Sequence, residues 1–471
     1  MSLQSELSVV VLAAGEGTRM HGDMPKVLYS LCGRPMISYV LDAAQTLTPR
    51  KIVLVIGHKG EEVRQYIQST WPRQNAPVDF CWQRQQKGTA HAVMCAKEAL
   101  LVDDPDVLVL YGDTPLLNGQ TLAAFARAHK EEGAHLSLVT TVLQDPSAYG
   151  RVVRDSQGNV SRIVEARDAT PEERRIREVN AGIYLAKASL LFDLLSQVGN
   201  SNAKDEYYLT DIVSLAIVSG HRVFAFMCED EGVVQGINDR WALAQAEETK
   251  RRAILEDLAL SGVTVRDPSS TYVDSGVTVG PDTTLEPHTY LRGSTTIGPK
   301  CCIGPGTEIR NSKVGAGSRV WMSVVEDSVI EDGVQIGPFS HLRPNSLLKT
   351  GALVGNFAEV KNSVVGLGTK IHHHSYIGDT DLGQGVNIGA GTVTVNYDGK
   401  RKHRTTIEDG AFIGCNANLI APVTIGKRSY VAAGSTITHD VPEDSLAIAR
   451  ERQVVKEGWV SKRSEQDQGR N

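Results

Sequence analysis

The N-terminal region contains a short segment whose residue types suit phosphate binding. Residues 12–20 read LAAGEGTRM and directly follow an apolar run, and Pro25 and Lys26 come a few positions later. Glycines let backbone N–H groups approach phosphate oxygens, and Arg19 and Lys26 add positive charge. The spacing is neither the dinucleotide-binding fingerprint nor a Walker loop. The glycines alone leave two interpretations open, a phosphate-binding loop or an ordinary strand-to-helix turn.

Three polar stretches stand out in the C-terminal region: 342–344 (LRP), 354–361 (VGNFAEVK) and 372–379 (HHHSYIGD). Imidazole is the commonest metal ligand, so three consecutive histidines first suggest zinc. Consecutive residues of a β-coil point alternately inward and outward, which disfavours three neighbours sharing one ion. We therefore expect no zinc, and the cluster is either catalytic or an exposed group of histidines without a role.

The first part of the chain has the pattern of an α/β domain. Short apolar runs alternate with amphipathic or polar stretches, and the runs occupy residues 8–15, 51–58, 106–113 and 135–143. This alternation predicts a Rossmann-like, mostly parallel sheet covered by helices. Ligands of such sheets bind at the carboxyl ends of the strands, which draws attention to residues 15–26 and to Asp113.

The second part has a hexapeptide repeat. Residues 238–260 lack Gly and Pro and predict a connecting helix. Beyond this segment an aliphatic residue recurs every six positions, at Val279, Leu285, Leu291, Ile297, Ile303 and Ile309, then at Val365, Ile371 and Ile377, and finally at Ile413, Leu419, Ile425, Val431 and Ile437. This spacing predicts a left-handed parallel β-helix, interrupted by a loop at 394–405.

These patterns predict four parts: an α/β domain over 1–237, the helix 238–260, a β-helix domain over 261–460 and a disordered polar tail over 461–471.

The composition of the chain limits the classes of function that it can have. Lys and Arg number 49 against 55 Asp and Glu, a net charge of −6, so we expect no nucleic-acid partner. Seven cysteines without a CxxC pair indicate a reducing compartment. Without a signal peptide or a long apolar stretch, we expect a cytoplasmic protein that is not inserted in a membrane.

The phosphate-binding segment closely resembles the signature of the sugar-nucleotide pyrophosphorylases, GxGTRM followed by PK. Further matches come in the family's order: Gln83, Gly88-Thr89, Tyr111-Gly112-Asp113, Tyr149-Gly150-Arg151, Val164-Glu165, Asn180-Ala181-Gly182 and Gly236-Ile237-Asn238. The resemblance implies catalytic roles for Arg19 and Lys26, and nucleotide contacts from Leu12, Ala13, Ala14, Gly15 and Tyr111. It also implies that Gln83, Gly88 and Thr89 bind uracil and that Gly150, Glu165 and Asn180 hold an amino sugar.

Nucleotidyl transfer requires a sugar-phosphate oxygen to attack the α-phosphorus of a nucleoside triphosphate, with pyrophosphate leaving. Positioning and charge neutralisation carry such a reaction without a protein nucleophile. Two cationic side chains do not offset a triphosphate and a sugar phosphate, so we expect Mg²⁺. Asp113, at a strand end, suits this ion, and the resemblance assigns Asn238 as the second ligand.

The C-terminal motifs LRP, VGNF-x-E-x-K, H-x-x-Y-x-GD, VNIGAGT and NYDG resemble the acetyltransferase domain of the bifunctional N-acetylglucosamine-1-phosphate uridyltransferases and glucosamine-1-phosphate acetyltransferases. With the N-terminal motifs, the resemblance covers nearly the whole chain. It implies that His373 is the general base and that Glu359 orients it. It places the sugar phosphate at Arg343 and Lys361, and the rest of the sugar pocket at Tyr376, Asn387, Asn396 and Tyr397.

By the same resemblance, acetyl-CoA lies beside Ala390, Lys402, Cys415, Ala433 and Arg450, and the chain forms a homotrimer through its β-helices with acetyl sites at subunit boundaries. The implied enzyme uses acetyl-CoA and UTP to make UDP-N-acetylglucosamine, a precursor of envelope polysaccharides. Two alternatives remain. One is a nucleotidyltransferase whose repeats only assemble it, which Glu359 and His373 disfavour. The other is a non-catalytic regulatory subunit, which Arg19, Lys26 and Asp113 disfavour.

Overall fold

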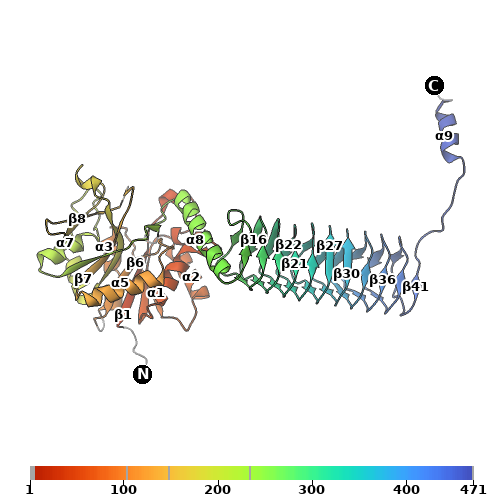
Figure 1. Cartoon of the computed structure of the whole chain (residues 1–471), viewed down its shortest axis with the longest axis horizontal. Helices are drawn as coiled ribbons and strands as arrows, with labels where there is room; N and C mark the ends of the chain where they lie inside the picture. The colour runs from red at the N-terminus through yellow and green to blue at the C-terminus, as the bar shows by residue number, and fades with distance from the viewer. Residues whose placement is uncertain (1–5, 102–103, 147–148, 233–234, 469–471) are drawn as a thin grey trace. The chain divides into compact units, whose positions relative to one another are not determined.

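The computed structural model describes residues 6–101, 104–146, 149–232 and 235–468. The chain divides into two compact units, residues 1–250 and 251–471 (Figure 1). The division falls inside helix α8 (Arg240–Leu260), which lies in the segment expected to connect two domains. The first unit is an α/β structure and the second consists of stacked β-coils, so we describe each by itself.

The first unit is built on one mixed β-sheet. Its main strands are β1 (Leu7–Ala13), β4 (Lys51–Ile56), β5 (Val78–Trp82), β6 (Asp106–Tyr111), β7 (Leu136–Val142), β10 (Glu178–Lys187) and β11 (Val223–Met227), with β8 (Arg151–Arg154) and β9 (Val160–Val164) at the side. They follow the order β11-β7-β10-β6-β1-β4-β5. The four predicted runs form β1, β4, β6 and β7, which confirms the mostly parallel sheet. Strand β10 runs antiparallel to β6 and β7, a feature that the apolar runs did not indicate.

Helices cover both faces of this sheet (Figure 1). One layer contains α1 (Met36–Gln45), α2 (Gly60–Thr70) and α5 (Gly119–Glu131), and the other contains α3 (Thr89–Met94), α6 (Ala188–Leu195) and α7 (Asp211–Val218). Strand side chains alternate between the layers: Val9 and Val11 pack toward the first and Val10 toward the second. Full burial of such a side chain contributes roughly 1.5–3 kcal/mol, so this alternation fixes the register of the sheet.

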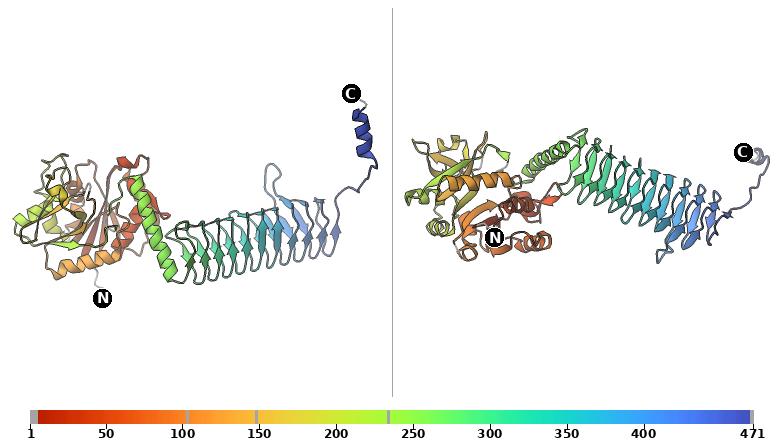
Figure 2. Two further views of the ribbon diagram at one scale, coloured as in Figure 1. Left: turned by 45° about the horizontal axis from the view of Figure 1, so that its top comes forward. Right: turned by 60° about the horizontal axis from the view of Figure 1, so that its bottom comes forward.

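The second unit is a left-handed parallel β-helix. Its short strands, from β12 (Thr264–Val265) to β41 (Leu446–Ala447), form stacked sheets of 11, 10 and 9 strands in the described part of the chain (Figure 2). The aliphatic positions of the hexapeptide repeat point into the coil, where Leu285, Ile371 and Ile413 are fully buried. This burial confirms the β-helix prediction.

The expected interruption of the coil is present. Strand β34 (Val393–Val395) ends and β35 (Thr405–Ile407) begins on either side of residues 396–404, which leave the coil as a loop. An antiparallel bridge joins Tyr397 and Lys402 across this loop. The loop is therefore confirmed, with bounds slightly narrower than the sequence indicated.

The two halves of α8 pack in different cores. Ala246 belongs to a buried cluster of the first unit with Met20 and Tyr39. Leu255 packs instead with Val263 at the start of the β-helix core. Each unit thus has its own hydrophobic core that includes part of this helix.

The C-terminal tail corrects one expectation. We expected disorder from residue 461 onward, but helix α9 covers Trp459–Gln468; residues 469–471 lie outside the described part of the chain. The physical reason is local propensity, because this stretch lacks Gly and Pro and contains Lys, Arg, Glu and Gln, which favour helix even without an apolar face.

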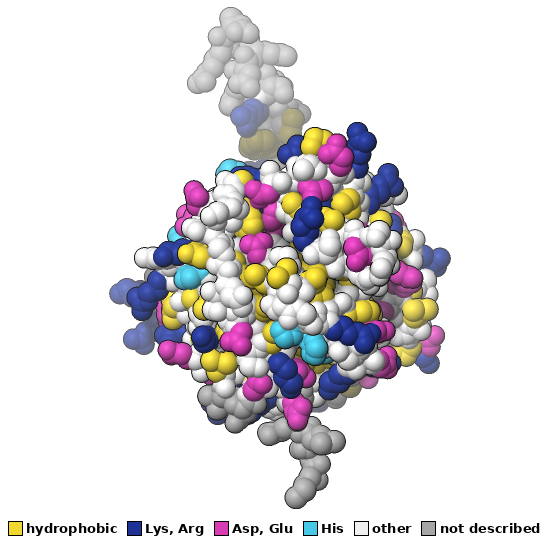
Figure 3. Space-filling view, turned by 90° about the vertical axis from the view of Figure 1, so that its left-hand side faces the viewer, with side chains coloured by type: hydrophobic (Ala, Val, Ile, Leu, Met, Phe, Trp, Pro, Cys, Tyr) yellow, Lys and Arg dark blue, Asp and Glu magenta, His cyan; other side chains and the backbone are white. Residues whose placement is uncertain are grey.

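Two further features concern the chemistry of the surface and of the cysteines. The seven cysteines form no disulfide among the described residues. On the face of the first unit shown in Figure 3, acidic and basic side chains are interspersed. Among the described helices, none has the length and apolar character needed to cross a membrane.

Candidate active sites

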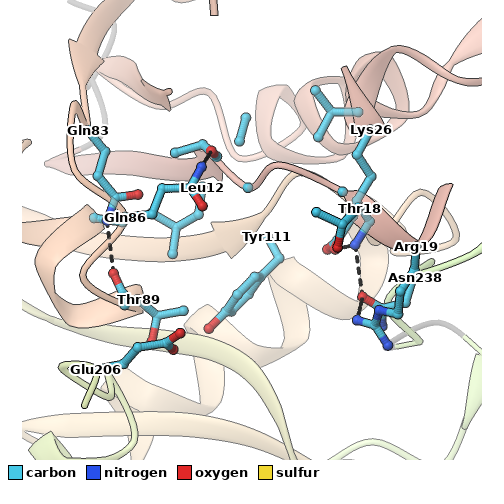
Figure 4. A pocket seen from close by; sticks show the side chains of 18 residues that line it. Leu12, Thr18, Arg19, Lys26, Gln83, Gln86, Thr89, Tyr111, Glu206 and Asn238 are labelled. Carbon is cyan, nitrogen blue, oxygen red and sulfur yellow. Dashed lines mark hydrogen bonds and ion pairs between the residues drawn. The ribbon is translucent and has the colours of Figure 1, made fainter. Parts of the chain in front are cut away.

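A cavity of about 340 Å³ lies where the carboxyl ends of β1 and β6 meet. It brings together nearly all the residues expected to bind a nucleotide. Its lining includes Leu12, Ala13, Ala14, Gly15, Arg19, Lys26, Gln83, Gly88, Thr89, Tyr111, Asp113 and Asn238. In Figure 4, Gln83 and Thr89 lie toward one end, Lys26, Arg19 and Asn238 toward the other, and Tyr111 lies between them.

Cations and oxygen acceptors converge at one end of this cavity. The Lys26 Nζ donates to Asp113 Oδ2 at 2.5 Å and to Asn238 Oδ1 at 2.9 Å. The Arg19 guanidinium donates to the same Asn238 oxygen at 2.9 Å. Lys26 opens the short 3-10 helix η2 (Lys26–Leu28), and Arg19 lies in η1 (Thr18–Met20). The two residues expected to hold a metal therefore direct oxygens at one cationic group.

The other end of the cavity is shaped by a glycine and by amide groups. Gln83 Nε2 donates to the Gly88 carbonyl at 2.9 Å, which orients the Gln83 carboxamide. Gly88 has a φ of +102°, and a Cβ there would lie 2.5 Å from the Tyr207 carbonyl oxygen. Glycine is therefore required at this position. The Thr89 hydroxyl accepts the Leu209 N–H at 3.0 Å, which places Thr89 at the start of α3.

A second cavity of about 310 Å³ opens from the first and shares Tyr111 and Asp113 with it. Gly150, Glu165 and Asn180, the residues expected to hold the sugar, all line it. Asn180 is buried and donates to the Tyr184 hydroxyl at 2.7 Å, and its Oδ1 accepts the Gly182 N–H at 3.1 Å.

Glu165 is the acidic group of the second cavity. Its Oε1 accepts a hydrogen bond from the Thr210 hydroxyl at 3.2 Å. Burial raises the pKa of Glu165, and the hydrogen bond from Thr210 opposes this effect only in part. Burial also raises the pKa of Tyr111, with a smaller contribution from the Glu165 charge, so Tyr111 is a neutral hydroxyl at physiological pH.

In the β-helix, residues expected in the acetyltransferase site lie above one another on successive coils. Strands β25 (His341–Leu342), β28 (Glu359–Lys361) and β31 (Tyr376–Gly378) pair in parallel, which places Glu359 directly beside Tyr376. Arg343 follows β25 and donates to Glu359 Oε1 at 2.9 Å. Arg343, Glu359 and Tyr376 thus lie on one face of the β-helix.

His373 has a different partner from the one expected. Its Nδ1 lies 2.7 Å from Asn356 Oδ1, because strands β27 (Leu353–Asn356) and β30 (Lys370–His373) pair these two residues in register. Glu359 lies on a strand of another sheet and pairs with Arg343. Asn356 is thus a contact of His373 that the sequence did not indicate, and the orienting role expected of Glu359 stays a prediction. An accepting carboxamide oxygen places the imidazole proton on Nδ1 and leaves Nε2 free as a base.

A second cationic group lies at the next corner of the coil. Lys361 Nζ is 3.8 Å from Asp379 Oδ2, and Asn396 donates to the same carboxylate and, at 3.4 Å, to the Tyr376 hydroxyl. Burial opposes ionisation of Asp379, but hydrogen bonds from Asn362 and Asn396 lower its pKa. Lys402, on the loop, lies against Lys361, whose proximity lowers the pKa of Lys402.

Apart from Lys402, which lies on the loop, the residues expected at acetyl-CoA lie on successive coils of one corner. The Asn416 N–H donates to the Ala390 carbonyl at 2.7 Å, and the Gly434 N–H donates to the Cys415 carbonyl at 2.8 Å. Arg450 donates to the Ala433 carbonyl at 3.0 Å and continues the column. Asn387 and Tyr397 lie apart from this column, in β33 (Asn387–Ile388) and on the loop.

Comparison with known proteins covers both units. The family model for nucleotidyl transferases matches residues 8–244, and the model for bacterial transferase hexapeptide repeats matches residues 276–311 and 404–439. The chain is 46% identical to the bifunctional protein GlmU of Caldicellulosiruptor saccharolyticus over 99% of this chain and 100% of that protein. It is 45% identical to the GlmU proteins of Pelobacter propionicus and Listeria monocytogenes, over 96% and 97% of this chain and 98% of each relative.

The chain belongs to the GlmU family of bifunctional proteins. It is therefore an enzyme that combines a nucleotidyltransferase domain with a hexapeptide transferase domain. The resemblance inferred from the motifs is confirmed for the chain as a whole. The roles of single residues rest on the geometry above and remain predictions.

Within this GlmU family member, sequence reasoning missed several residues that line the nucleotidyltransferase cavities. Gln86 donates to the Ala14 carbonyl at 2.8 Å, and Glu206 and Thr18 also line the first cavity. Gln86 lies between Gln83 and Gly88 in the sequence, a proximity that was a usable signal. Glu206 comes from a distant loop, and no local pattern identifies it.

The burial of Glu165 predicts a pH-dependent cost to stability. Because the folded-state pKa is raised, the folded protein binds more protons than the unfolded chain between the two pKa values, and stability falls as pH rises through that interval. Glu165→Gln keeps an acceptor for Thr210 and removes this cost. We expect thermal denaturation to show a gain in stability over the wild type near pH 7 that shrinks near pH 4.

Glu173→Gln is the matched control, because hydrogen bonds from Thr170 and Arg162 lower the pKa of Glu173. The ionised Glu173 carboxylate stabilises the folded protein at neutral pH, and this stabilisation is lost on acidification. The Glu173→Gln variant should therefore lose stability near pH 7 and approach the wild type near pH 4. If both variants changed stability in the same direction near pH 7, the result would contradict the opposite pKa shifts of Glu165 and Glu173.

Proposed function

We propose that this enzyme makes UDP-N-acetylglucosamine in two steps. The β-helix acetylates glucosamine-1-phosphate with acetyl-CoA, and the first unit then transfers uridylyl from UTP to N-acetylglucosamine-1-phosphate, releasing pyrophosphate. The observation that carries the proposal is that one chain holds two separate groups of polar side chains, Lys26 paired with Asp113 in the first unit, and His373 and the pair Arg343–Glu359 in the β-helix. Purified protein assayed with all substrates, omitting each in turn, tests it.

For uridylyl transfer, a phosphate oxygen of the sugar phosphate attacks the α-phosphorus of UTP. The new P–O bond forms as the bond to the β-phosphate oxygen breaks, and pyrophosphate leaves. Gln83, Gly88 and Thr89 hold the base at one end of the cavity, so that the triphosphate extends toward Arg19 and Lys26 at the other. These two cations neutralise charge that develops on the leaving pyrophosphate.

The residues present fit Mg²⁺. Asp113 Oδ2 and Asn238 Oδ1 both lie within 2.9 Å of the Lys26 ammonium, so two oxygens already face one cation. Mg²⁺ typically takes one or two protein oxygens and completes its shell with phosphate oxygens and water. When bound, the ion would neutralise phosphate charge beyond what two side chains can offset. Asp113 and Asn238 would hold it.

For acetyl transfer, the sugar amine attacks the thioester carbonyl of acetyl-CoA. The N–C bond forms and the C–S bond then breaks, so the CoA thiolate leaves. His373 Nε2 takes the proton that the attacking nitrogen must lose, and Asn356 holds the imidazole in the required tautomer. Arg343 and Lys361 bind the sugar phosphate, with Tyr376, Asn387 and Asn396 completing the pocket.

Acetyl-CoA would lie along the corner column of Ala390, Cys415, Ala433 and Arg450. The carbonyls of this column accept backbone hydrogen bonds on successive coils, which leaves a regular surface for an extended ligand. CoA brings several phosphates, and a coil face alone offers few cations. Lys402 and the loop beside it supply them, and the lysine pair formed by Lys361 and Lys402 favours an anion between its members.

The β-helix also supports a homotrimer. Met322, Phe339 and Phe357 follow one another along one corner and are 41%, 56% and 57% exposed. The rings of Phe339 and Phe357 stack with centroids 5.4 Å apart. His374, beside His373, is next along the corner, since its N–H donates to the Asn356 carbonyl. We infer that other copies of the chain cover this apolar corner, which would place the acetyl site at a subunit boundary.

The proposed substrates are small molecules of the cytoplasm, UTP and acetyl-CoA among them. This chemistry, together with seven cysteines that form no disulfide among the described residues, supports a cytoplasmic enzyme. The product would serve the synthesis of peptidoglycan and lipopolysaccharide.

Asp113→Asn tests the uridylyl site. The substitution keeps the size of the side chain and removes the charge that holds the divalent ion. Uridylyl transfer should fall by roughly 10²-fold or more, while acetyl transfer and the melting temperature stay unchanged. Normal use of UTP at limiting Mg²⁺ would show that Asp113 is not a ligand.

His373→Ala tests the acetyl site. Loss of a general base should lower acetyl transfer by roughly 10²- to 10⁴-fold with uridylyl transfer intact. His372→Ala and His374→Ala are matched controls on either side and should lower acetyl transfer far less. Equal losses in all three variants, or bound zinc in metal analysis, would refute the assignment of His373.

Phe357→Glu tests the trimer. A charge in the apolar corner should dissociate the assembly, which light scattering measures, and should abolish acetyl transfer with uridylyl transfer retained. Val329→Glu, at a position 44% exposed on another face of the β-helix, serves as the control and should leave the assembly intact. A trimeric Phe357→Glu variant would contradict the proposed interface.

A further inference from the structure

Arg240, the first residue of α8, contacts the loop that carries Arg19. Arg240 Nε donates to the Met20 carbonyl oxygen at 2.8 Å, and its terminal nitrogen donates to the Tyr29 hydroxyl at 3.2 Å. The guanidinium carbon also lies 5.0 Å from the centre of the Tyr29 ring. One side chain thus makes three contacts with a loop that is more than two hundred residues away in the sequence.

The contact falls at the end of the turn that positions Arg19. Met20 is the last residue of η1, and the carbonyls at a helix end lack partners within the helix. Gly17 and His21 flank η1 in left-handed conformations, so backbone bends on both sides set the direction of this turn. Arg240 supplies both the donor and the positive charge that a helix C-terminus favours.

The loop lies closely against Arg240 and Tyr29. A Cβ at Gly22 would lie 2.1 Å from the Tyr29 hydroxyl oxygen and 2.9 Å from a terminal nitrogen of Arg240. The Met20 side chain is buried in one cluster with Tyr29 and Ile237. The loop therefore has little room to shift while the Arg240 contacts are intact.

The segment that leads into α8 also holds the side chain of Arg19. Asn238 Oδ1 accepts from the Arg19 guanidinium at 2.9 Å, and the Ile237 N–H donates to the Asp113 carbonyl at 2.9 Å. Residues 237–240 thus contact the backbone after Arg19, the guanidinium of Arg19 and the backbone of Asp113. The position of one catalytic cation relative to the metal-binding carboxylate depends on this short segment.

We propose that Arg240 is a positioning residue for uridylyl transfer, which fixes η1 so that the Arg19 guanidinium stays over the triphosphate site. The inference rests on the uridylyl transfer proposed above. Arg240 does not line the nucleotide cavity, so it acts through Met20 and Arg19. Misplacing a catalytic group by about 1 Å costs up to about 10²-fold in rate.

The test measures kcat and KM for both reactions in the full-length protein. Arg240→Ala should lower kcat for uridylyl transfer by about 10- to 100-fold. KM for UTP should change little, because Gln83, Gly88 and Thr89 still hold the base. Arg240→Lys keeps the charge and one donor but cannot bind Met20 and Tyr29 together, so we expect it to restore part of kcat.

Arg251→Ala is the matched control on the same helix. Arg251 also lies over a tyrosine ring, 4.4 Å from the centre of Tyr272, and donates to the Ser269 carbonyl at 3.2 Å, but these contacts lie in the β-helix unit. It should leave uridylyl transfer unchanged. Acetyl transfer should stay at the wild-type level in Arg240→Ala.

The outcomes separate the inference from the proposed function. A wild-type protein without uridylyl transfer refutes the proposed function itself. With an active wild type, an unchanged kcat in Arg240→Ala overturns the positioning role. So does an equal loss of both activities with a lower melting temperature, since this result indicates general destabilisation. No recovery at all in Arg240→Lys would also count against the role, because the charge and the donor to Met20 are kept. A loss confined to kcat of uridylyl transfer, partly recovered by lysine, supports the inference.

Discussion

The alternation of side chains along parallel strands is the constraint on which both units depend. In the first unit, period-two alternation buries Val9 and Val11 on one face of the sheet and Val10 on the other, which fixes the strand register. In the β-helix, the inward aliphatic residue of each hexapeptide locks each coil over the previous one. In the β-helix, a shift by one residue would turn these aliphatic side chains outward, so the register is strongly specified. Both active sites are consequences of this register.

Register decides which polar side chains meet. Asp113 follows β6 and Gly15 follows β1, and the two strands are neighbours in the sheet, so the phosphate loop and the carboxylate share one edge. In the β-helix, the same rule brings Asn356 beside His373 and Glu359 beside Tyr376. The spacing between successive coils is regular, because backbone hydrogen bonds and a fully buried core set it.

Sequence reasoning identified features that depend on local periodicity. The strands β1, β4, β6 and β7 and the inward positions of the β-helix follow from apolar spacing, and all are present. Features that depend on contacts between residues distant in the sequence were missed. They are the antiparallel strand β10, the contact of Asn356 with His373 and the hydrogen bond from Arg240 to the Met20 carbonyl. The helix α9 was missed for a different reason, because propensity alone supports it without an apolar stripe.

Three cations of the two sites have carboxylate partners before any substrate binds. Lys26 pairs with Asp113, Arg343 with Glu359 and Lys361 with Asp379. In a chain of net charge −6, such pairs place the cations without leaving them uncompensated. An exposed pair contributes at most about 1 kcal/mol, so a phosphate that carries two charges and several oxygens displaces a carboxylate such as Glu359 at little cost. A ligand with a single charge gains less from the exchange. The pairing therefore holds each cation in position and favours phosphorylated sugars and nucleotides over weaker anions.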